Sequence, residues 1–520
     1  MTKMKNKKYA IAAALLVAFN AMSCSDDNIS AMPEVDMQAT DNYFDAGESY
    51  KSDLYVKPYV GYVGDPMPMY DSQAKMFRVY YLHDMRDGNS TIYHPIHQLA
   101  TADAAAYQNL NEAVPCGAAD EDDPAIGTGS EIYADGKYQM FYTGHKARSP
   151  REVLLKAISA DGVTWTKDRS FRFQAPAGYN QDEFRDPYVF FDGEAKLYRM
   201  VVAAIKDGKA VLAQFTSTDL ATWKEAEPFF KNKWGRFYEC PDVFRMGDYW
   251  YLVYSDKDVT RQVQYFYAKS LKDLMNMGDD PAFPWRDEGK LEGTSFYAGK
   301  TASDGQNRYI WGWCATRQGN LSEGVKDWAG ALVAHKLVQN ADGTLGFDCP
   351  DAVKGLFKTD AGVHQLGSEG NATGNAASGY TLAAGSSVRF ARTNYRNLIE
   401  FDVQANPGQS VFGLAFADCS DRSYDYRVYI EDRWNNLKFD RVEQSADGTE
   451  SRQNINAFSF IHPDDGKYHI TAVTDQSVCV VYVNGQYAFT NRIYGLQRNP
   501  WSLFCSDGEV KITGLKISTF

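Results

Sequence analysis

The chain has 520 residues, which is too long for one ordinary hydrophobic core and therefore predicts two domains. Aromatic residues make up 14% of the chain, a share that favours β structure, and the formal net charge is −13. This acidic balance argues against nucleic acid or an anionic membrane surface as a binding partner.

The N-terminus has the pattern of a targeting segment. A basic start is followed by an apolar run, residues 10–19, that is too short to span a bilayer, and then by Ala21-Met22-Ser23-Cys24. This resembles a bacterial lipoprotein signal of Bacteroidetes type, with a signal peptide over residues 1–23, an acylated Cys24 and an acidic tether over residues 24–48. An ordinary cleaved secretory signal is the alternative. A lipid anchor would place the protein in the outer membrane, on its cell-surface or periplasmic side.

Residues 49–355 carry a repeat of β type. Similar strand starts recur 52 to 61 residues apart, and four of the five follow an Asp-Gly or Gly-Asp turn signal. Five antiparallel units of this length predict a five-bladed β-propeller. The five strand starts are Phe77, Tyr138, Leu197, Tyr249 and Tyr309.

Three carboxylates occupy similar places in this repeat. Asp65, Asp186 and Glu239 lie 12, 11 and 10 residues before the strand start of their unit, and a similar count back from Tyr309 reaches Tyr297. These positions fall on the innermost strands, which surround one central funnel in a propeller. Because two carboxylates must flank the bond that is cleaved in sugar hydrolysis, this convergence predicts a glycoside hydrolase.

The pattern changes after about residue 350. Residues 356–387 are rich in Gly, Ala, Ser and Asn, which predicts a linker. Residues 388–520 contain alternating strand patterns, such as residues 398–403 and 478–483, and the tight-turn pair Asn484-Gly485. The sequence therefore predicts an all-β protein in which the propeller is followed by a C-terminal β-sandwich.

Taken together, several motifs resemble glycoside hydrolase family 32, the fructan and sucrose hydrolases, over nearly the whole chain after the leader. Each motif alone is weak, but their order and spacing make the resemblance specific. In chain order they are Gly64-Asp65-Pro66-Met67-Pro68, Gly127-Thr-Gly-Ser130, Phe184-Arg-Asp-Pro187, Tyr238-Glu-Cys-Pro241, Thr294-Ser-Phe-Tyr-Ala-Gly-Lys-Thr301, Ile310-Trp-Gly-Trp313, Val481-Tyr-Val-Asn-Gly485 and Asn491-Arg-Ile-Tyr494.

The resemblance implies retaining hydrolysis of β-fructofuranosyl linkages in fructans or fructo-oligosaccharides, so that the partner is an oligo- or polysaccharide. It implies that Asp65 is the nucleophile and that Glu239 is the general acid and base. Asp186 would hydrogen-bond sugar hydroxyls, and Arg185 would orient it. The two carboxyls of a retaining pair lie about 5–5.5 Å apart.

Other residues of these motifs are candidate substrate contacts. Tyr297 and Trp313 could form sugar platforms, although Trp313 equally suits the core. Ser130 either contacts substrate or caps a turn. His83 stands where the family has a glutamine that would contact substrate, and Gly64 stands where it has an asparagine able to bind a sugar hydroxyl. These departures indicate altered recognition of the sugar, such as acceptance of another furanoside.

No cofactor or metal is expected, because the implied mechanism needs none and the 8 histidines show no ligand spacing. Apart from Cys24, an odd number of cysteines without close pairs argues against both a disulfide framework and a zinc cluster. The sequence carries no indication of oligomeric state.

Two other functions remain open. One is a related five-bladed hydrolase of arabinofuranosides that inverts, with its carboxyls about 6.5–9.5 Å apart. The other is a glycan-binding surface lipoprotein that captures without cleaving, which the changed residues around Asp65 suggest. The presence of both catalytic-type carboxylates favours hydrolysis, because capture alone does not need them.

Overall fold

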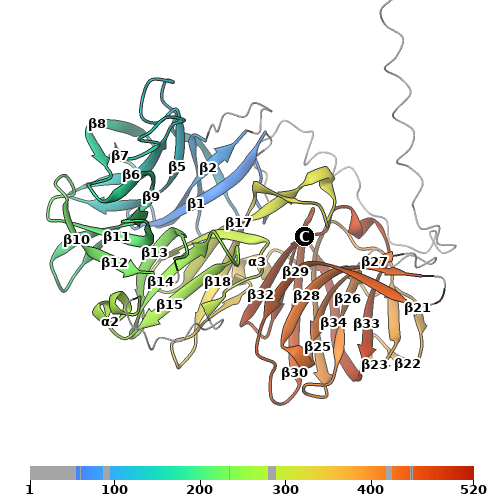
Figure 1. The fold of residues 1–520 in the computed structure, drawn as a ribbon. Coiled ribbons are helices and arrows are strands. Elements are labelled where there is room, and N and C mark those ends of the chain that lie inside the picture. The colour runs from blue at the N-terminus through green and yellow to red at the C-terminus, as the bar shows by residue number, and fades with distance from the viewer. Residues whose placement is uncertain are drawn as a thin grey trace, which may run out of the picture.

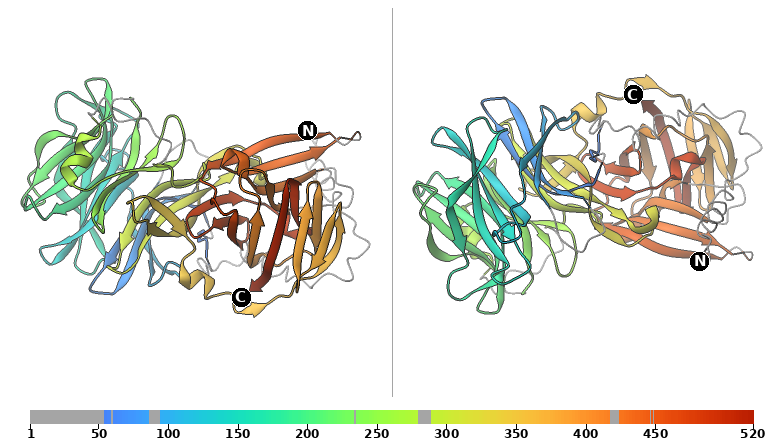
Figure 2. Two further views of the ribbon diagram at one scale, coloured as in Figure 1. Left: turned by 90° about the horizontal axis from the view of Figure 1, so that it is seen from below. Right: turned by 90° about the horizontal axis from the view of Figure 1, so that it is seen from above.

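The computed structural model describes residues 54–520, except residues 59, 86–93, 233–234, 279–288, 417–423, 446 and 448. The predicted signal peptide, tether and lipidated Cys24 lie outside the described residues. The described chain is almost entirely β structure and forms two bodies side by side, one coloured blue to yellow and one orange to red (Figures 1 and 2). Within the described ranges, no helix is long and apolar enough to cross a membrane.

The described strands of the first body form five antiparallel blades, as the repeat predicts, and the five predicted strand starts fall on the second strand of each blade. Blades one and two contain β1 (Tyr62–Asp71), β2 (Met76–Asp84), β3 (Ile96–Thr101), β4 (Gln108–Val114), β5 (Ala125–Ala134), β6 (Lys137–His145), β7 (Glu152–Ser159) and β8 (Trp165–Gln174). Blade three contains β9 (Tyr179–Asp192), β10 (Leu197–Lys206), β11 (Lys209–Ser217) and β12 (Lys224–Lys231). Blades four and five contain β13 (Tyr238–Met246), β14 (Tyr249–Asp256), β15 (Val263–Ala268), β16 (Phe296–Ser303), β17 (Arg308–Arg317), β18 (Lys326–Gln339) and β19 (Leu345–Asp348). Short helices follow three of these strands: α2 (Leu271–Asn276), η3 (Gln318–Asn320) and α3 (Asp351–Lys354).

The blades close into a ring. The innermost strands β1, β5, β9, β13 and β16 contact one another in that order, and β16 contacts β1. Strand β18 also pairs with β1 at Gly330 and Val63, so that the first and last blades share one sheet. The ring brings segments that are far apart in sequence to one central axis.

The second body is a sandwich of two antiparallel sheets. One sheet contains β22 (Ala372–Asn375), β23 (Gly379–Ala383), β34 (Glu509–Thr519), β25 (Arg396–Ala405), β30 (Lys467–Asp475), β31 (Val478–Val483) and β32 (Tyr487–Arg492), with β20 (Thr359–Asp360) beside β34. The other contains β21 (Gln365–Glu369), β24 (Ser386–Phe390), β33 (Trp501–Asp507), β26 (Val411–Phe416), β27 (Tyr424–Glu431), β28 (Asn436–Gln444) and β29 (Glu450–Ser459). Two short helical turns are η4 (Asp432–Trp434) and η5 (Leu496–Arg498).

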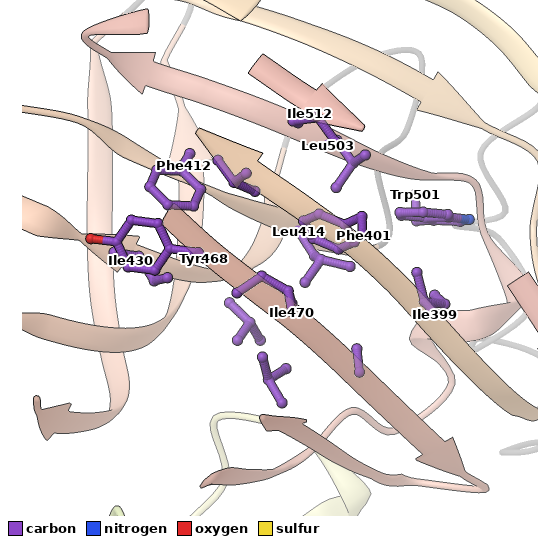
Figure 3. Close-up of a cluster of buried hydrophobic side chains, with 14 of the residues drawn as sticks. Ile399, Phe401, Phe412, Leu414, Ile430, Tyr468, Ile470, Trp501, Leu503 and Ile512 are labelled. Carbon is purple, nitrogen blue, oxygen red and sulfur yellow. The ribbon is translucent and has the colours of Figure 1, made fainter. Parts of the chain in front are cut away.

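The inner faces of both sheets supply the sandwich core. Phe401 and Ile470 from one sheet pack with Phe412 and Trp501 from the other, and all four side chains are buried (Figure 3). Each such side chain stabilises the fold by roughly 1.5–3 kcal/mol relative to exposure. Alternation along the end of β25 reflects one buried and one solvated face, whereas β31 is buried at every position because its other face packs against blade five.

The prediction of a linker over residues 356–387 is wrong. This segment contains β20 to β23 and the start of β24, and it pairs with both sheets of the sandwich. Its small and polar residues look like a loop because β21 and β22 are exposed edge strands. Pairing through backbone hydrogen bonds holds such strands with little help from their side chains.

The two domains share a packed interface. Phe347 of blade five and Tyr482 of the sandwich belong to one buried apolar cluster, and His335 Nδ1 lies 2.9 Å from the Tyr482 hydroxyl. Arg492 donates to the backbone oxygens of Cys314 and Ala315 on β17. The sandwich therefore holds blade five in place.

Candidate active site

Each innermost strand of the propeller contains a β-bulge. At one point the strand has one residue more than the neighbouring strand of its blade, and a bulge of this kind re-aims side chains. The five irregularities lie between Val63 and Pro66, Gly127 and Gly129, Arg185 and Tyr188, Glu239 and Asp242, and Tyr297 and Lys300. The bulges therefore recur at one level of the ring, where the predicted carboxylates lie.

The three acids take different positions within these bulges. Glu239 is the last regularly paired residue, Asp186 is the first residue of its bulge and Asp65 is the second. As predicted, the three acids lie at the same level of the ring. Their positions relative to the bulge differ by one or two residues, so the prediction of strictly equivalent positions is wrong. Counting residues back from a strand start misses this difference, because a bulge is defined by how the strand pairs with its neighbour and not by the sequence of the strand alone.

The bulge also explains how two neighbours reach one cavity. Successive side chains of a regular strand point to opposite faces. Asp186 has a φ of 57°, in the left-handed region, and both Arg185 and Asp186 line the same cavity. Cys240 and Ala298, the first bulge residues of blades four and five, have similar φ values of 51° and 54°.

A cavity of about 510 Å³ opens at the centre of the ring. The three acids line it, together with Arg185 and the aromatic residues Tyr297, Trp313 and Trp328. Further lining residues carry positive charge or a titratable ring: Lys257, Arg261, Lys326, His94 and His145. Such a mixture of convergent carboxyls and aromatic rings suits a neutral, hydroxyl-rich ligand.

Asp65 is held by two neutral donors. Thr128 Oγ1 donates to Asp65 Oδ2 at 2.6 Å, and Trp313 Nε1 donates to Oδ1 at 2.8 Å. Burial raises the pKa of Asp65, whereas these two hydrogen bonds favour the ionised form and nearby Glu239 raises the pKa further. The donors therefore orient the carboxylate and support its charge.

Glu239 has different partners. Arg185 Nη2 donates to Glu239 Oε1 at 2.9 Å, and the Tyr297 hydroxyl donates to Oε2 at 2.8 Å. Both oxygens are thereby fixed by groups from two other strands, β9 and β16. The carboxyls of Asp65 and Glu239 thus have separate hydrogen-bond environments, as distinct chemical roles require.

Asp186 is buried beside both of them. Cys240 N donates to Asp186 Oδ2 at 2.9 Å. Burial raises the pKa of Asp186 to about 7, with Arg185 opposing this rise and Glu239 and Asp65 adding to it. Asp186 therefore changes its charge near neutral pH.

Arg185 links these groups to blade two. Its guanidinium contacts Glu152 at 3.2 Å, pairs with Glu183 and lies 4.3 Å from the centre of the Phe237 ring. Glu152 also accepts a hydrogen bond from Phe184 N at 2.6 Å. These contacts restrict the rotation of Arg185, so that one nitrogen remains directed at Glu239.

Cys240 lies beside the acids but is not suited to attack. Its thiol is 3.9 Å from Asp65 Oδ2, and burial together with the nearby carboxylates raises its pKa well above the usual value. The thiol therefore remains protonated.

Two of the predicted contact residues do not line the cavity. The Ser130 hydroxyl donates to Pro187 O and accepts from Val189 N, each at 2.9 Å, and so ties β5 to β9. His83 Nε2 lies 2.7 Å from Val60 O, and its other ring nitrogen contacts His97. Both side chains support the fold around the site.

The lining residues that sequence reasoning missed include Thr128, His94 and Trp328. Thr128 lies inside a motif that was singled out, but nothing marked its hydroxyl. Trp328 lies on β18, outside every motif. The described residues contain no group of three or more His, Cys, Asp or Glu side chains arranged to hold a metal ion.

Comparisons with known proteins place this geometry in a family. Residues 55–345 match the glycosyl hydrolases family 32 N-terminal domain, and residues 343–517 match the GH32, BT1760-like, C-terminal domain. The sucrose-6-phosphate hydrolase of Escherichia coli is 26% identical over 318 residues, covering 58% of this chain and 64% of that protein. The levanase of Bacillus subtilis is 27% identical over 224 residues, covering 40% of this chain and 30% of that protein.

Solved structures agree on the fold. Fructan 1-exohydrolase IIa from Cichorium intybus superposes with a TM-score of 0.67 at 17% identity, covering 91% of this chain and 98% of that chain. The present chain spans less than two thirds of the length of the two curated relatives named above. Because the family match of the N-terminal domain alone exceeds half of the chain, the protein belongs to glycoside hydrolase family 32.

Proposed function

We propose that this protein hydrolyses β-fructofuranosyl linkages in fructans or fructo-oligosaccharides with retention of configuration. The observation that carries the proposal is the pair Asp65 and Glu239, which share one cavity but have different hydrogen-bond partners. Relatives named as levanase and fructan 1-exohydrolase support the substrate class.

In the first step, Asp65 attacks the anomeric carbon of a fructofuranosyl unit. The bond from that carbon to the glycosidic oxygen breaks, and its electron pair stays on the oxygen, which takes a proton from Glu239. The products are a leaving sugar and an ester between the fructosyl unit and Asp65. Thr128 and Trp313 hold the carboxylate in the orientation that the attack needs.

In the second step, water attacks the same carbon and the ester bond to Asp65 breaks. Glu239, now ionised, takes the proton from this water and returns to its starting state. Two displacements at one carbon restore its configuration. Asp186 accepts hydrogen bonds from sugar hydroxyls more strongly as positive charge develops on the ring.

The first test is product release from levan, inulin and sucrose. The protein without residues 1–23 is incubated with each, and free fructose and oligosaccharides are separated by chromatography. Release by the wild type, with a loss of roughly 10²-fold or more in Glu239→Ala, is the expected result. Glu225→Gln, an exposed change on β12, is the matched control and should keep full activity.

The alternatives give different results when arabinofuranosyl oligosaccharides are added to these substrates. Release of sugar from arabinofuranosyl oligosaccharides alone would show that the substrates are arabinofuranosides and not fructans. Binding without release from any of them would identify a capture protein. Added methanol tests retention, because a covalent fructosyl intermediate yields methyl β-fructofuranoside, whereas an inverting enzyme does not.

We also propose that acylation of Cys24 anchors the protein to the outer membrane and that only the lipid contacts the bilayer. The lipoprotein-like leader and the acidic composition support this proposal. Metabolic labelling with a palmitate analogue should mark the wild type but not Cys24→Ala. Protease treatment of intact cells then separates the cell surface from the periplasmic side, and equal labelling of both proteins would exclude the anchor.

A further inference from the structure

The loop that leads into β16 connects the cavity to the sandwich. Thr294 of this loop lines the cavity, and its backbone N and its Oγ1 donate to Asn456 Oδ1 at 2.9 and 3.0 Å. Asn456 lies on β29 of the sandwich and is only 2% exposed. Two residues before Thr294, Glu292 Oε1 accepts a hydrogen bond from Thr490 N of β32 at 2.6 Å. This loop of the propeller is thus bonded to the sandwich at two points.

Gly293, between these two points, allows the domains to approach closely. Its φ lies outside the left-handed region, so its backbone conformation does not require a glycine. A Cβ at this position would lie 2.9 Å from both Nδ2 and Oδ1 of Asn456, and 2.9 Å from Cε2 of Phe489. The glycine is therefore explained by the sandwich that packs against it.

All hydrogen-bonding positions of the Asn456 amide are occupied. Its Oδ1 accepts the two bonds from Thr294, and its Nδ2 donates to Thr490 O at 3.2 Å and to Asn491 Oδ1 at 2.8 Å. Strand β32, which contains Thr490 and Asn491, lies on the side of the sandwich that faces blade five and contacts β17 (Figure 1). The four bonds fix the rotation of the amide and therefore the position of Thr294.

Thr294 in turn holds a lysine of the cavity wall. Lys326 Nζ donates to Thr294 O at 2.7 Å and also to Thr294 Oγ1. Lys326 is the first residue of β18 and lines the cavity. An ammonium group has three protons, so one remains after the two bonds to Thr294. The two domains thus position one hydrogen-bond donor of the cavity together.

The charge of Lys326 is not neutralised by its neighbours. Among the described residues, Lys326 forms no salt bridge, and its hydrogen-bond acceptors belong to the neutral Thr294. Burial and the nearby Arg317 lower the pKa of Lys326 to about 8, so most of the ammonium is still protonated at pH 7. Glu292 opposes this shift, but burial raises the pKa of Glu292 to about 8 as well, so most of this carboxyl is neutral. A partly buried cation of this kind requires further hydrogen-bond acceptors.

We propose that Lys326 donates a hydrogen bond to a hydroxyl oxygen of the bound oligosaccharide, and that Asn456 of the sandwich holds Lys326 in place through Thr294. Lys326 is then a substrate-binding residue, and Asn456, which does not line the cavity, is a positioning residue. The sandwich thereby sets the affinity for substrate in addition to supporting blade five. This inference rests on the proposed hydrolysis, because it assigns residues to the same cavity.

The test is a double-mutant cycle on the substrate that the wild type cleaves, measuring kcat and KM. Lys326→Met should raise KM by about tenfold and leave kcat within about twofold, because a contact made equally in the bound substrate and the transition state affects binding alone. Asn456→Ala should raise KM in the same way, since Thr294 and Lys326 lose their fixed position. In the Lys326→Met background, Asn456→Ala should add less than about twofold to KM.

Two controls separate this effect from loss of a lysine and from damage to the domain interface. Lys336→Met removes an ammonium from the same strand that pairs with Asp351 outside the cavity, and it should leave kcat and KM unchanged. Tyr482→Phe removes another bond between the domains, to His335, and should leave both constants unchanged at a temperature where it is folded.

Thermal unfolding identifies any variant that does not fold. If Asn456→Ala does not fold, Thr294→Val replaces it in the cycle, because it removes the hydroxyl and keeps the backbone bond to Asn456. The proposal is overturned if Lys326→Met changes KM by less than about twofold, or if the increases in KM simply multiply. It is also overturned if Tyr482→Phe raises KM as much as Asn456→Ala, since the sandwich would then act only as a general support.

A binding measurement keeps this result separate from the proposed hydrolysis. Fructo- and arabinofuranosyl oligosaccharides are titrated by calorimetry into Glu239→Gln and into Glu239→Gln with Lys326→Met. Binding that is about tenfold weaker without Lys326 supports the inference, even where the wild type cleaves no fructan. Equal affinity of the two proteins, or no binding of either sugar to Glu239→Gln, overturns it.

Discussion

Asp186 shows how burial sets the charge of a single side chain in the site. Its carboxyl is only 3% exposed, and burial raises its pKa from 3.8 to about 7. Between these two pH values the folded protein therefore holds a proton that the unfolded chain has lost. Stability must then fall as the pH rises through this range, because the folded state binds more protons than the unfolded state.

Asp186→Asn should remove this dependence. The variant should be more stable than the wild type at pH 8, by up to roughly 4 kcal/mol, and nearly equal to it at pH 4. Hydrolysis should fall by roughly 10²-fold or more, because the amide accepts hydrogen bonds from sugar hydroxyls less strongly. Denaturant unfolding at several pH values, with Glu225→Gln as control, measures the difference; parallel curves for the wild type and Asp186→Asn would contradict the shift.

At the scale of an element, the five bulges convert a regular sheet into a site. Each bulge lets an innermost strand present side chains that a flat strand would turn away from the funnel. In blades three, four and five, the first bulge residue is a non-glycine residue with positive φ: Asp186, Cys240 or Ala298. For an L-residue this conformation costs roughly 1–2 kcal/mol, which the surrounding packing must offset.

Ala298 is the place to test this strain. It is fully buried and lies next to Tyr297, which holds Glu239. Ala298→Val should lower stability by roughly 2 kcal/mol or more and reduce kcat, because a β-branched side chain is poorly accommodated at positive φ. Ala298→Gly should leave both nearly unchanged, since glycine adopts this φ freely. Equal effects of the two substitutions in thermal unfolding and kinetics would exclude strain at this bulge.

At the scale of the whole molecule, the sandwich acts as a support for blade five. That blade carries Tyr297, Trp313 and Trp328, and its strand β18 contacts the sandwich through His335 and Tyr482. His335 is fully buried, and burial lowers its pKa to about 3, so the ring is neutral at pH 7. In the buried interface, the hydroxyl of Tyr482 is the hydrogen-bond partner of His335 Nδ1.

Tyr482→Phe should therefore destabilise the contact between the domains. Leaving His335 Nδ1 without this partner should cost about 1–3 kcal/mol and let the two domains unfold at separate temperatures. Tyr429→Phe is the control, because its hydroxyl bonds Asp440 within the sandwich and touches no blade. Calorimetry distinguishes the two outcomes, and a single unchanged transition in Tyr482→Phe would rule out the proposed support.

Much of the propeller, including the positions of its three acids, could be predicted from short-range patterns in the sequence. Turn pairs such as Asp135-Gly136 mark hairpins over a few residues, so the spacing of the blades follows from the chain alone. Asp65, Asp186 and Glu239 were found because each lies a similar distance before the strand start of its unit. Residues 356–387 were misread for the same reason, since their local composition hides edge strands that only the rest of the sheet defines.

The sequence by itself thus determined the fold class, the number of blades and the carboxylates of the funnel, since these depend on local periodicity. Only the tertiary structure decided the register of the bulges, the place of Trp328 in the cavity lining and the contact of Asn456 with Thr294. Asn456 and Thr294 meet because the sandwich packs against blade five. A contact between two domains leaves no periodic signal in the sequence, because neither residue constrains its own neighbours along the chain.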